Sequence, residues 1–312
     1  METAPKVDWN LMDRLKTDDS VKQADTIKSE IHEWVNQDLR PFNVRDLDHD
    51  LDIILKDRKS QRTTVLNQLV SDGVLVRDKD KRGSYRPALK SIAPMDFTGA
   101  PDDPLPIFLP LGVHKVVQIY PGNIIQINGE KNSGKTAYIL NCIKFNMRSS
   151  KVYYFNSEMG ESELKLRLGL FLKTFNDMSG MEDWTFTAYE RSSNFEDVIV
   201  PGKGNINIID FLEEHTEFWR MGEHMRKIHD ALDGAVAIVA IQKNFGQEMG
   251  LGGSRTEEKP RLILNISNGK LKIKMAKNWV GGENPNGQVI DFKLAQGCKF
   301  VAKHGWYRDK KK

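Results

Sequence analysis

The chain has 312 residues, enough for a domain of about 200 residues with its own core and a second, smaller domain. Its 39% hydrophobic and 29% charged residues are ordinary for a soluble protein, and no apolar run approaches the roughly 18 residues that span a bilayer. The N-terminus lacks the basic start and apolar middle of a signal peptide. We therefore expect a cytoplasmic protein of two domains with no membrane partner, and the net charge of +3 does not narrow its function.

Residues 1–20 are polar and acidic without periodicity, and we expect a flexible N-terminus there. Residues 21–90 have the pattern of a small winged-helix domain, which is three helices and a hairpin. The first helix is indicated by apolar residues on one face, at Ile27, Ile31, Trp34 and Val35. Two more helices are expected at 44–55 and 61–70, and the hairpin at 74–76 and 84–86.

Residues 91–120 are rich in proline and are expected to form an extended linker. Residues 121–303 then alternate strands with helices, which predicts an α/β fold with a mainly parallel sheet covered on both faces. The strands are expected at 123–127, 151–156, 206–209, 235–241, 261–266, 271–276 and 288–294. The helices are expected at 136–147, 161–175 and 217–232. Residues 304–312 form a basic tail.

The two cysteines, Cys142 and Cys298, both fall in apolar stretches far apart in the sequence. This favours a reduced, buried role over a disulfide. The seven histidines form no ligand-spaced pair with each other or with the cysteines, which argues against structural zinc.

Residues 129–136 match the whole of the phosphate-loop (P-loop) pattern G-x-x-x-x-G-K-[ST], between an apolar strand and an apolar helix. The backbone amides of such a loop cradle phosphate oxygens, Lys135 reaches the terminal phosphates, and the Thr136 hydroxyl ligates Mg²⁺. The sequence thus predicts a site for ATP and Mg²⁺. Its residues are Gly129, Glu130, Lys131, Asn132, Ser133, Gly134, Lys135 and Thr136.

Three polar residues follow apolar strands and are expected at the same rim of the sheet. Glu158 follows the strand 151–156, where it could accept a proton from the water that attacks the γ-phosphate; the alternative is a solvated glutamate at a helix start. Asp210 ends the strand 206–209 and could hold Mg²⁺ directly or through water. Gln242 ends the strand 235–241, where its amide could sense the γ-phosphate and pass its presence to the following loop.

These segments, in this order, resemble the RecA/DnaB superfamily of DNA-dependent ATPases over roughly residues 105–303. The resemblance rests on Pro121-Gly122-Asn123 before the P-loop, Phe155-Asn156-Ser157-Glu158-Met159, Ile208-Ile209-Asp210-Phe211-Leu212 and the strand that ends in Gln242. It implies that Glu158 is the catalytic base, Asp210 the metal acid and Gln242 the sensor. It also implies a homo-oligomer, either a ring or a filament, with active sites between subunits.

Lys277-Asn278-Trp279-Val280-Gly281 is similar to a lysine-asparagine-arginine-aromatic-glycine motif of the RadA-like branch, whose basic residue reaches a neighbouring subunit. Trp279 stands where that motif has arginine. Lys277 could supply the positive charge instead, although a lysine lacks the bidentate fork of arginine, so we expect slow hydrolysis. The alternative is a solvated lysine at a strand end.

Basic residues predict two DNA contacts. Arg58, Lys59 and Arg62 cluster at the expected start of the third helix, and Lys81 and Arg82 lie in the wing, an arrangement suited to duplex DNA. Arg255 and Lys259 belong to a glycine-containing loop after Gln242, where RecA-like proteins bind single-stranded DNA. The alternatives are a winged helix that binds protein and a loop that is a plain surface connection. The basic tail is a further, auxiliary candidate.

Phe97-Thr98-Gly99-Ala100 is similar to the Phe-x-x-Ala segment with which archaeal and eukaryotic recombinases dock on a neighbouring ATPase core. The resemblance implies that Phe97 and Ala100 contribute to oligomerisation.

We interpret the chain as an oligomeric, Mg²⁺-ATP-dependent DNA-binding ATPase of replication or recombination, helicase-like or recombinase-like. Its pairing of domains suggests a mobile element as its origin. One alternative is a regulator or loader in which ATP binding acts as a switch with little hydrolysis, which Trp279 favours. Another is an assembly protein whose winged helix binds a second protein.

Overall fold

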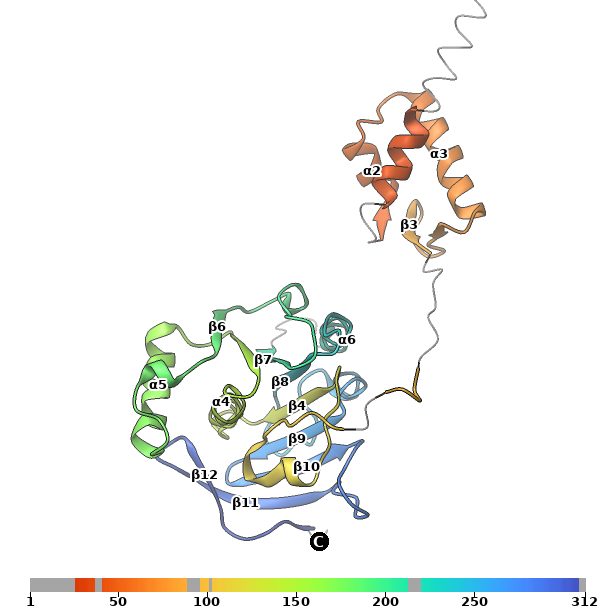
Figure 1. Cartoon of the computed structure of the whole chain (residues 1–312). Helices are drawn as coiled ribbons and strands as arrows, with labels where there is room; N and C mark the ends of the chain where they lie inside the picture. The colour runs from red at the N-terminus through yellow and green to blue at the C-terminus, as the bar shows by residue number, and fades with distance from the viewer. Residues whose placement is uncertain (1–25, 37–40, 89–95, 101–102, 213–219, 309–312) are drawn as a thin grey trace, which may run out of the picture. The chain divides into compact units, whose positions relative to one another are not determined.

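The computed structural model describes residues 26–36, 41–88, 96–100, 103–212 and 220–308 (Figure 1). The chain divides into two compact units, residues 1–100 and residues 101–312. We describe each unit by itself. Within the described residues, no helix is long and apolar enough to cross a lipid bilayer.

The N-terminal unit contains helices and a small antiparallel sheet. Residues 26–36 are helical, followed by α2 (Val44–Asp50) and α3 (Lys56–Ser71). Strands β1 (Phe42–Asn43), β2 (Leu75–Arg77) and β3 (Ser84–Pro87) form a sheet in the order β1-β3-β2. Its core includes Ile27, Ile31, Leu47, Leu66 and Tyr85. The helices and the hairpin that the sequence predicted are present, and their interpretation as a winged helix stays a prediction.

The helix boundaries of this unit differ from the prediction because local capping and a turn decide them. Asn43 caps α2, since its side chain accepts from the Arg45 amide while Asp46 accepts from the Asn43 amide. The helix ends at Asp50 instead of residue 55, and Asp52 takes a left-handed backbone with φ 50°. The third helix then begins at Lys56, five residues before the predicted start.

The C-terminal unit is built on one ten-stranded sheet with the order β12-β11-β10-β9-β4-β8-β7-β5-β6, where β13 pairs with β11. Strands β4 (Ile124–Gly129), β5 (Lys151–Asn156), β6 (Thr187–Glu190), β7 (Asn205–Leu212), β8 (Val236–Gln242) and β9 (Leu262–Ser267) are parallel. Strands β10 (Lys270–Ala276), β11 (Gln288–Ala295), β12 (Lys299–Ala302) and β13 (Tyr307–Arg308) add antiparallel pairs. The predicted α/β fold with a mainly parallel sheet is confirmed.

Helices cover both faces of this sheet (Figure 1). Strand β8 divides its apolar side chains: Ile238 packs with α4 (Lys135–Asn146) and α5 (Glu161–Thr174), and Val239 packs with α6 (Met221–Ala231) on the opposite face. Short 3₁₀ turns complete the unit, at η1 (Pro110–Lys115), η2 (Met181–Asp183), η3 (Phe195–Asp197) and η5 (Gly253–Glu257). Both cysteines are buried and free.

Residues 103–120, which the proline content assigned to an extended linker, pack onto the C-terminal core. Ile107, Leu109, Val113 and Ile119 are buried there, and the side chain of Asn146 on α4 hydrogen-bonds the backbone of Phe108 in both directions at 2.8 Å. The first residues of the predicted tail also belong to the folded unit, because β13 pairs with β11 and the Tyr307 hydroxyl donates to Asp291.

Candidate functional site

The P-loop joins β4 to α4, and its glycines are required by the backbone. Gly134 has φ 95° and immediately precedes α4. A Cβ on Gly129 would lie 2.2 Å from Cγ of Lys135 and 2.8 Å from Oγ of Ser133. Gly129 therefore permits the Lys135 side chain to fold back over the loop.

The ammonium of Lys135 is held by the loop that carries it. Its Nζ donates to the carbonyl oxygens of Gly129 at 3.1 Å and of Glu130 at 3.2 Å. Burial lowers the pKa of Lys135, and the carboxylates of Asp210 and Glu158 oppose that shift. A positive charge is therefore fixed beside the loop whose sequence pattern predicts a phosphate site.

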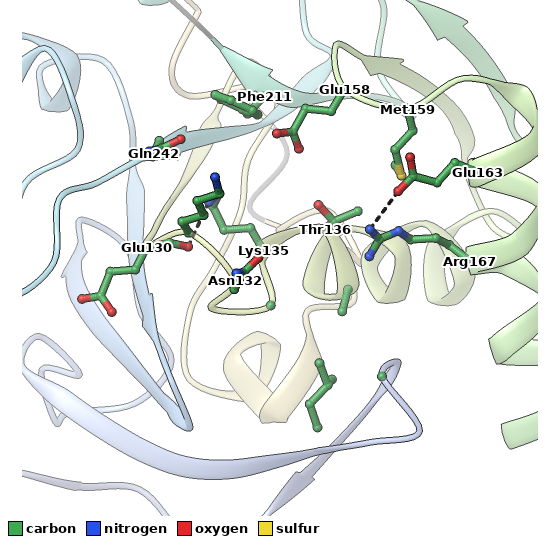
Figure 2. Close-up of a pocket in the computed structure, with 15 residues that line it drawn as sticks. Glu130, Asn132, Lys135, Thr136, Glu158, Met159, Glu163, Arg167, Phe211 and Gln242 are labelled. Carbon is green, nitrogen blue, oxygen red and sulfur yellow. Dashed lines mark hydrogen bonds and ion pairs between the residues drawn. The ribbon is translucent and has the colours of Figure 1, made fainter.

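A pocket of about 670 Å³ surrounds this lysine and brings together residues from five parts of the chain (Figure 2). The P-loop and the start of α4 form one wall. Glu158, Phe211 and Gln242 come from the ends of β5, β7 and β8, where parallel strands present their carboxyl ends. The remaining lining residues are Met159, Glu163, Arg167, Leu294 and Gly297.

Glu158 is exposed at the pocket, and the side chain of Asn156 shapes the turn that presents it. The Oδ1 of Asn156 accepts from the backbone amides of Glu158 at 3.1 Å and Met159 at 2.9 Å. Figure 2 shows the Glu158 carboxylate pointing into the pocket beside Phe211. This placement brings Glu158 within electrostatic reach of both Lys135 and Asp210.

Asp210 is buried beneath the pocket, and only one of its two carboxylate oxygens accepts a well-aligned hydrogen bond. Its Oδ2 accepts from the Tyr154 hydroxyl at 3.0 Å, whereas Oδ1 has no well-aligned hydrogen-bond partner among the described residues. Burial raises the pKa of Asp210 to about 6, although hydrogen bonding from Tyr154 and Thr136 limits the rise. A buried carboxylate oxygen beside a hydroxyl is an oxygen donor set that a hard cation such as Mg²⁺ could use.

Gln242 lies opposite Gly129 in the sheet, and the next residue ties the P-loop to the segment that follows β8. The Lys243 amide donates to the Gly129 carbonyl at 2.9 Å. The Lys243 ammonium donates to Oε1 of Glu130 at 2.7 Å and to the Gln247 carbonyl at 3.0 Å. Oε1 of Glu130 also accepts from the Gly246 amide and the Ser267 hydroxyl, each at 3.2 Å.

Sequence reasoning missed several of these residues. Lys243 could have been suspected from its place directly after the predicted sensor. Leu294 and Gly297 come from the hairpin of β11 and β12, so only the fold reveals them. Arg167 carries a weak signal, an i,i+4 pair with Glu163 at 2.9 Å on α5.

Lys277 lies away from this pocket. It follows β10, whose last residue pairs with Leu262 at the start of β9, whereas the P-loop strand ends beside Ile266. The Lys277 amide donates to the Arg261 carbonyl at 2.9 Å, and burial and the charge of Arg261 lower the pKa of Lys277. The adjacent Trp279 is fixed by a backbone bridge to Val117.

In the N-terminal unit, two of the predicted DNA contacts are engaged inside the unit. Arg58 pairs with Glu30 at 2.8 Å. Arg62 pairs with Asp48, and its side chain is only 11% exposed. Lys59, Lys81 and Arg82 are exposed cations, with no ion pair to another residue of the described ranges.

The other predicted residues lie on surfaces outside the pocket. Arg255 belongs to η5 and Lys259 follows it, both facing α6. Phe97 is 79% exposed in a turn where Oδ1 of Asp96 accepts from the Gly99 amide and the Thr98 hydroxyl, each at 2.9 Å. Ala100 is exposed as well.

The core domain is a P-loop α/β domain, defined by its mainly parallel sheet, its P-loop and the acids at the strand ends. No family model matches the sequence, and no curated protein matches it.

Solved structures similar to the chain include the RadB recombinase, at 16% identity and TM-score 0.44, covering 58% of this chain and 91% of that one. A KaiC-like protein from Pyrococcus horikoshii has 13% identity and TM-score 0.48, covering 65% and 100%. A DnaB-like replicative helicase has 16% identity and TM-score 0.49, covering 90% and 75%.

Proposed function

We propose that the protein is a Mg²⁺-dependent ATPase that binds DNA and works as an oligomer in the cytoplasm, in replication or recombination. The observation that supports this most is the convergence of one pocket: the P-loop with Lys135, the exposed carboxylate of Glu158 and the amide of Gln242, above the buried Asp210. A cation, a base, a sensor and a metal acid are the parts that phosphoryl transfer from ATP requires.

The chain's own groups divide the chemistry among them. The backbone amides of residues 129–136 and the ammonium of Lys135 would bind the phosphates. Thr136 and the unpartnered Oδ1 of Asp210 would hold Mg²⁺, which when bound neutralises charge on the phosphates. Glu158 would take the proton of the attacking water, because its carboxylate is exposed at the pocket and its turn is held by Asn156.

DNA would contact two basic surfaces. At the ATPase core, Arg255 and Lys259 would bind single-stranded DNA beside the segment that Lys243 ties to the P-loop. In the N-terminal unit, taken as a winged helix, Lys59, Lys81 and Arg82 are the exposed cations for duplex DNA. Arg58 and Arg62 would first have to leave Glu30 and Asp48, so we assign them weaker roles.

A neighbouring subunit would complete the site. Lys277 lies at the end of the sheet opposite its own P-loop, so it could reach a P-loop only on another copy of the chain. The exposed Phe97, with Ala100, would dock on that copy as an apolar anchor. The subunits would form a ring or a filament.

A switch with little hydrolysis is the second candidate function, in a regulator or loader. One observation favours it: Trp279, which replaces the arginine of the similar motif, is pinned to Val117 by a backbone bridge. Tryptophan carries no positive charge, so this position offers no guanidinium to the active site of a neighbouring subunit. Lys277, two residues earlier, supplies only a point charge.

ATP turnover measured without DNA, with single strands and with duplex separates these functions. Strong stimulation by single strands supports the ATPase. Retention on duplex with negligible turnover supports the switch. Absence of ATP binding in calorimetry would reject both.

A further inference from the structure

Three amide side chains lie in the interior of the sheet, among apolar neighbours. Gln126 and Asn128 belong to the central strand β4 and are 0% exposed, and Asn265 on β9 is 6% exposed. Asn128 and Asn265 stand opposite each other in the register of the two strands. A buried amide is costly unless its polar atoms are hydrogen-bonded, so each of these side chains needs partners inside the protein.

The amides form a chain of hydrogen bonds that runs in one direction. Nε2 of Gln126 donates to Oδ1 of Asn128 at 2.8 Å, and Nδ2 of Asn128 donates to Oδ1 of Asn265 at 3.0 Å. Nδ2 of Asn265 then donates to the carbonyl oxygen of Glu248 at 2.9 Å and to its Oε2 at 3.1 Å. Lys272 on β10 holds the other oxygen of this carboxylate at 2.9 Å. The last acceptor of the chain therefore belongs to the segment that follows β8.

The segment that supplies this acceptor, residues 248–251, is packed against the same amides. A Cβ on Gly250 would lie 2.6 Å from Oδ1 of Asn128, so the lack of a side chain lets the backbone pass directly against that amide. The next residue, Leu251, donates its amide to the carbonyl oxygen of Gln242 at 2.8 Å. Residues 248–251 thus connect the buried amides to the main chain of Gln242, which lines the P-loop pocket (Figure 2).

We propose that Asn128 and Asn265 are positioning residues for the side chain of Gln242, which they fix through residues 248–251. The proposal rests on the proposed function, in which Gln242 senses the γ-phosphate. Neither asparagine lines the P-loop pocket, so we assign neither a contact with bound nucleotide. Their effect passes through the backbone: the amides hold residues 248–250, and the Leu251 amide holds the end of the strand that carries Gln242.

The cost of these amides supports a role beyond filling the sheet. Aliphatic side chains such as Ile124 and Ile241 fill the same face of β4 and β8 without needing hydrogen-bond partners. The amide chain instead leaves Oε1 of Gln126 without a hydrogen-bond partner among the described residues, which is unfavourable. What the chain supplies in return is a single place for residues 248–251, because Nδ2 of Asn265 is satisfied only when Glu248 lies there.

The test is a double-mutant cycle in the full chain, with turnover measured at saturating ATP and ATP binding measured by calorimetry. Asn265→Ala should lower turnover roughly tenfold and leave ATP affinity within about twofold, because a misplaced group slows the reaction more than it weakens binding. In the Gln242→Ala background the same substitution should lower turnover by less than about twofold, since the group that Asn265 positions is then absent. Asn207→Ala is the matched control, because Asn207 is an equally buried amide on β7 that bonds the backbone of Val200 in both directions.

Hydrogen exchange of the nucleotide-free chain gives a second measurement, which does not depend on turnover. Asn265→Ala should speed exchange of the Leu251 backbone amide at least about tenfold, and Asn207→Ala should leave it unchanged. Gly250→Ala is the second variant if Asn265→Ala does not fold. Its added methyl group would press on Asn128, so it should change turnover and exchange in the same direction.

Equal losses of turnover from Asn265→Ala in the wild-type and Gln242→Ala backgrounds would overturn the proposal, because the asparagine would then act independently of Gln242. Unchanged exchange at Leu251 in the folded variant would overturn it as well. A wild-type chain that binds no ATP would reject the proposed ATPase. The exchange measurement would then decide alone whether Asn265 fixes residues 248–251.

Discussion

The ammonium of Lys243 lies 2.7 Å from Oε1 of Glu130, and the side chains of the two residues are only 3% and 12% exposed. The pair joins the second residue of the P-loop to the residue that follows Gln242. Charges at this depth are stable only when they are paired and fully hydrogen-bonded. The Glu130 carboxylate also accepts from the Gly246 amide and the Ser267 hydroxyl, and the Lys243 ammonium also donates to the Gln247 carbonyl. Movement of the P-loop should therefore displace the segment that follows β8, and movement of that segment should displace the P-loop.

Removing one partner of this pair should destabilise the domain. Lys243→Met leaves the Glu130 carboxylate buried without its cation, and we expect a loss of about 3 kcal/mol in the free energy of unfolding. The double variant E130Q/K243M should lose less than the sum of the single variants, because neither charge is then left alone. Urea unfolding measures both, and additive losses would show that the pair is not coupled.

Glu158→Gln should bind ATP as the wild type does and hydrolyse it at least about a hundredfold more slowly, because an amide cannot take a proton from water. Glu163→Gln is the matched control, since Glu163 lines the same pocket but is paired with Arg167 on α5. Steady-state turnover measures hydrolysis, and calorimetry measures ATP binding. Unchanged turnover in the Glu158 variant would remove its assignment as the base.

The raised pKa of Asp210 predicts how the free energy of unfolding changes with pH. Its folded pKa of about 6 lies above the ordinary aspartate value of 3.8, so the folded chain holds this proton more tightly than the unfolded chain. The stabilising effect of the protonated group is full below the unfolded pKa and is lost as pH rises through about 6.

Asp210→Asn should therefore raise the free energy of unfolding at pH 8, by on the order of 2 kcal/mol, and change it far less at pH 4. Urea unfolding of the metal-free chain at both pH values measures the difference. The same variant should lose Mg²⁺-dependent ATP binding. A greater gain at acid pH than at alkaline pH would contradict the assigned direction of the pKa shift.

Lys277 offers a test of subunit sharing. Lys277→Ala and Glu158→Gln should each be nearly inactive, since each lacks one part of a shared site. Mixed oligomers should regain part of the turnover, because one interface then combines an intact Glu158 with an intact Lys277. Mixtures that stay as inactive as the separate variants would assign Lys277 to its own subunit or to no catalytic role.

Phe97→Ala should reduce oligomer size in light scattering while ATP binding stays intact. The exposed ring loses most of its contact area with a partner when it is truncated, and it lies outside the P-loop pocket. Thr98→Ala is a useful control in the same turn. An unchanged oligomer in the Phe97 variant would reject its role as an anchor.

Local patterns were sufficient for seven of the ten strands and for the P-loop, because consecutive residues carry those signals. Strands β6, β12 and β13, which are short and mostly exposed, were not predicted. Contacts between segments that are distant in the sequence could not be predicted from these local patterns. Arg58 and Arg62 were expected to face DNA, but their partners Glu30 and Asp48 lie 28 and 14 positions away on other helices. Prolines correctly indicated an irregular backbone at residues 103–120, yet buried residues such as Leu109 and Val113 anchor that stretch to the core. Periodicity could not reveal them, because Leu109 lies outside any helix or strand and Val113 lies in a short 3₁₀ turn with a kink inside it.

The hydrogen bonds from Lys135 to the carbonyls of Gly129 and Glu130 have a consequence for the proposed binding of phosphate. A phosphate that binds there has to compete with those two carbonyl oxygens for the Lys135 ammonium. Its binding free energy is therefore the gain from its own contacts minus the loss of these two hydrogen bonds. If the site binds nucleotide as proposed, the ammonium would return to these two carbonyl oxygens when the phosphate leaves. This return would lower the free-energy cost of releasing the product.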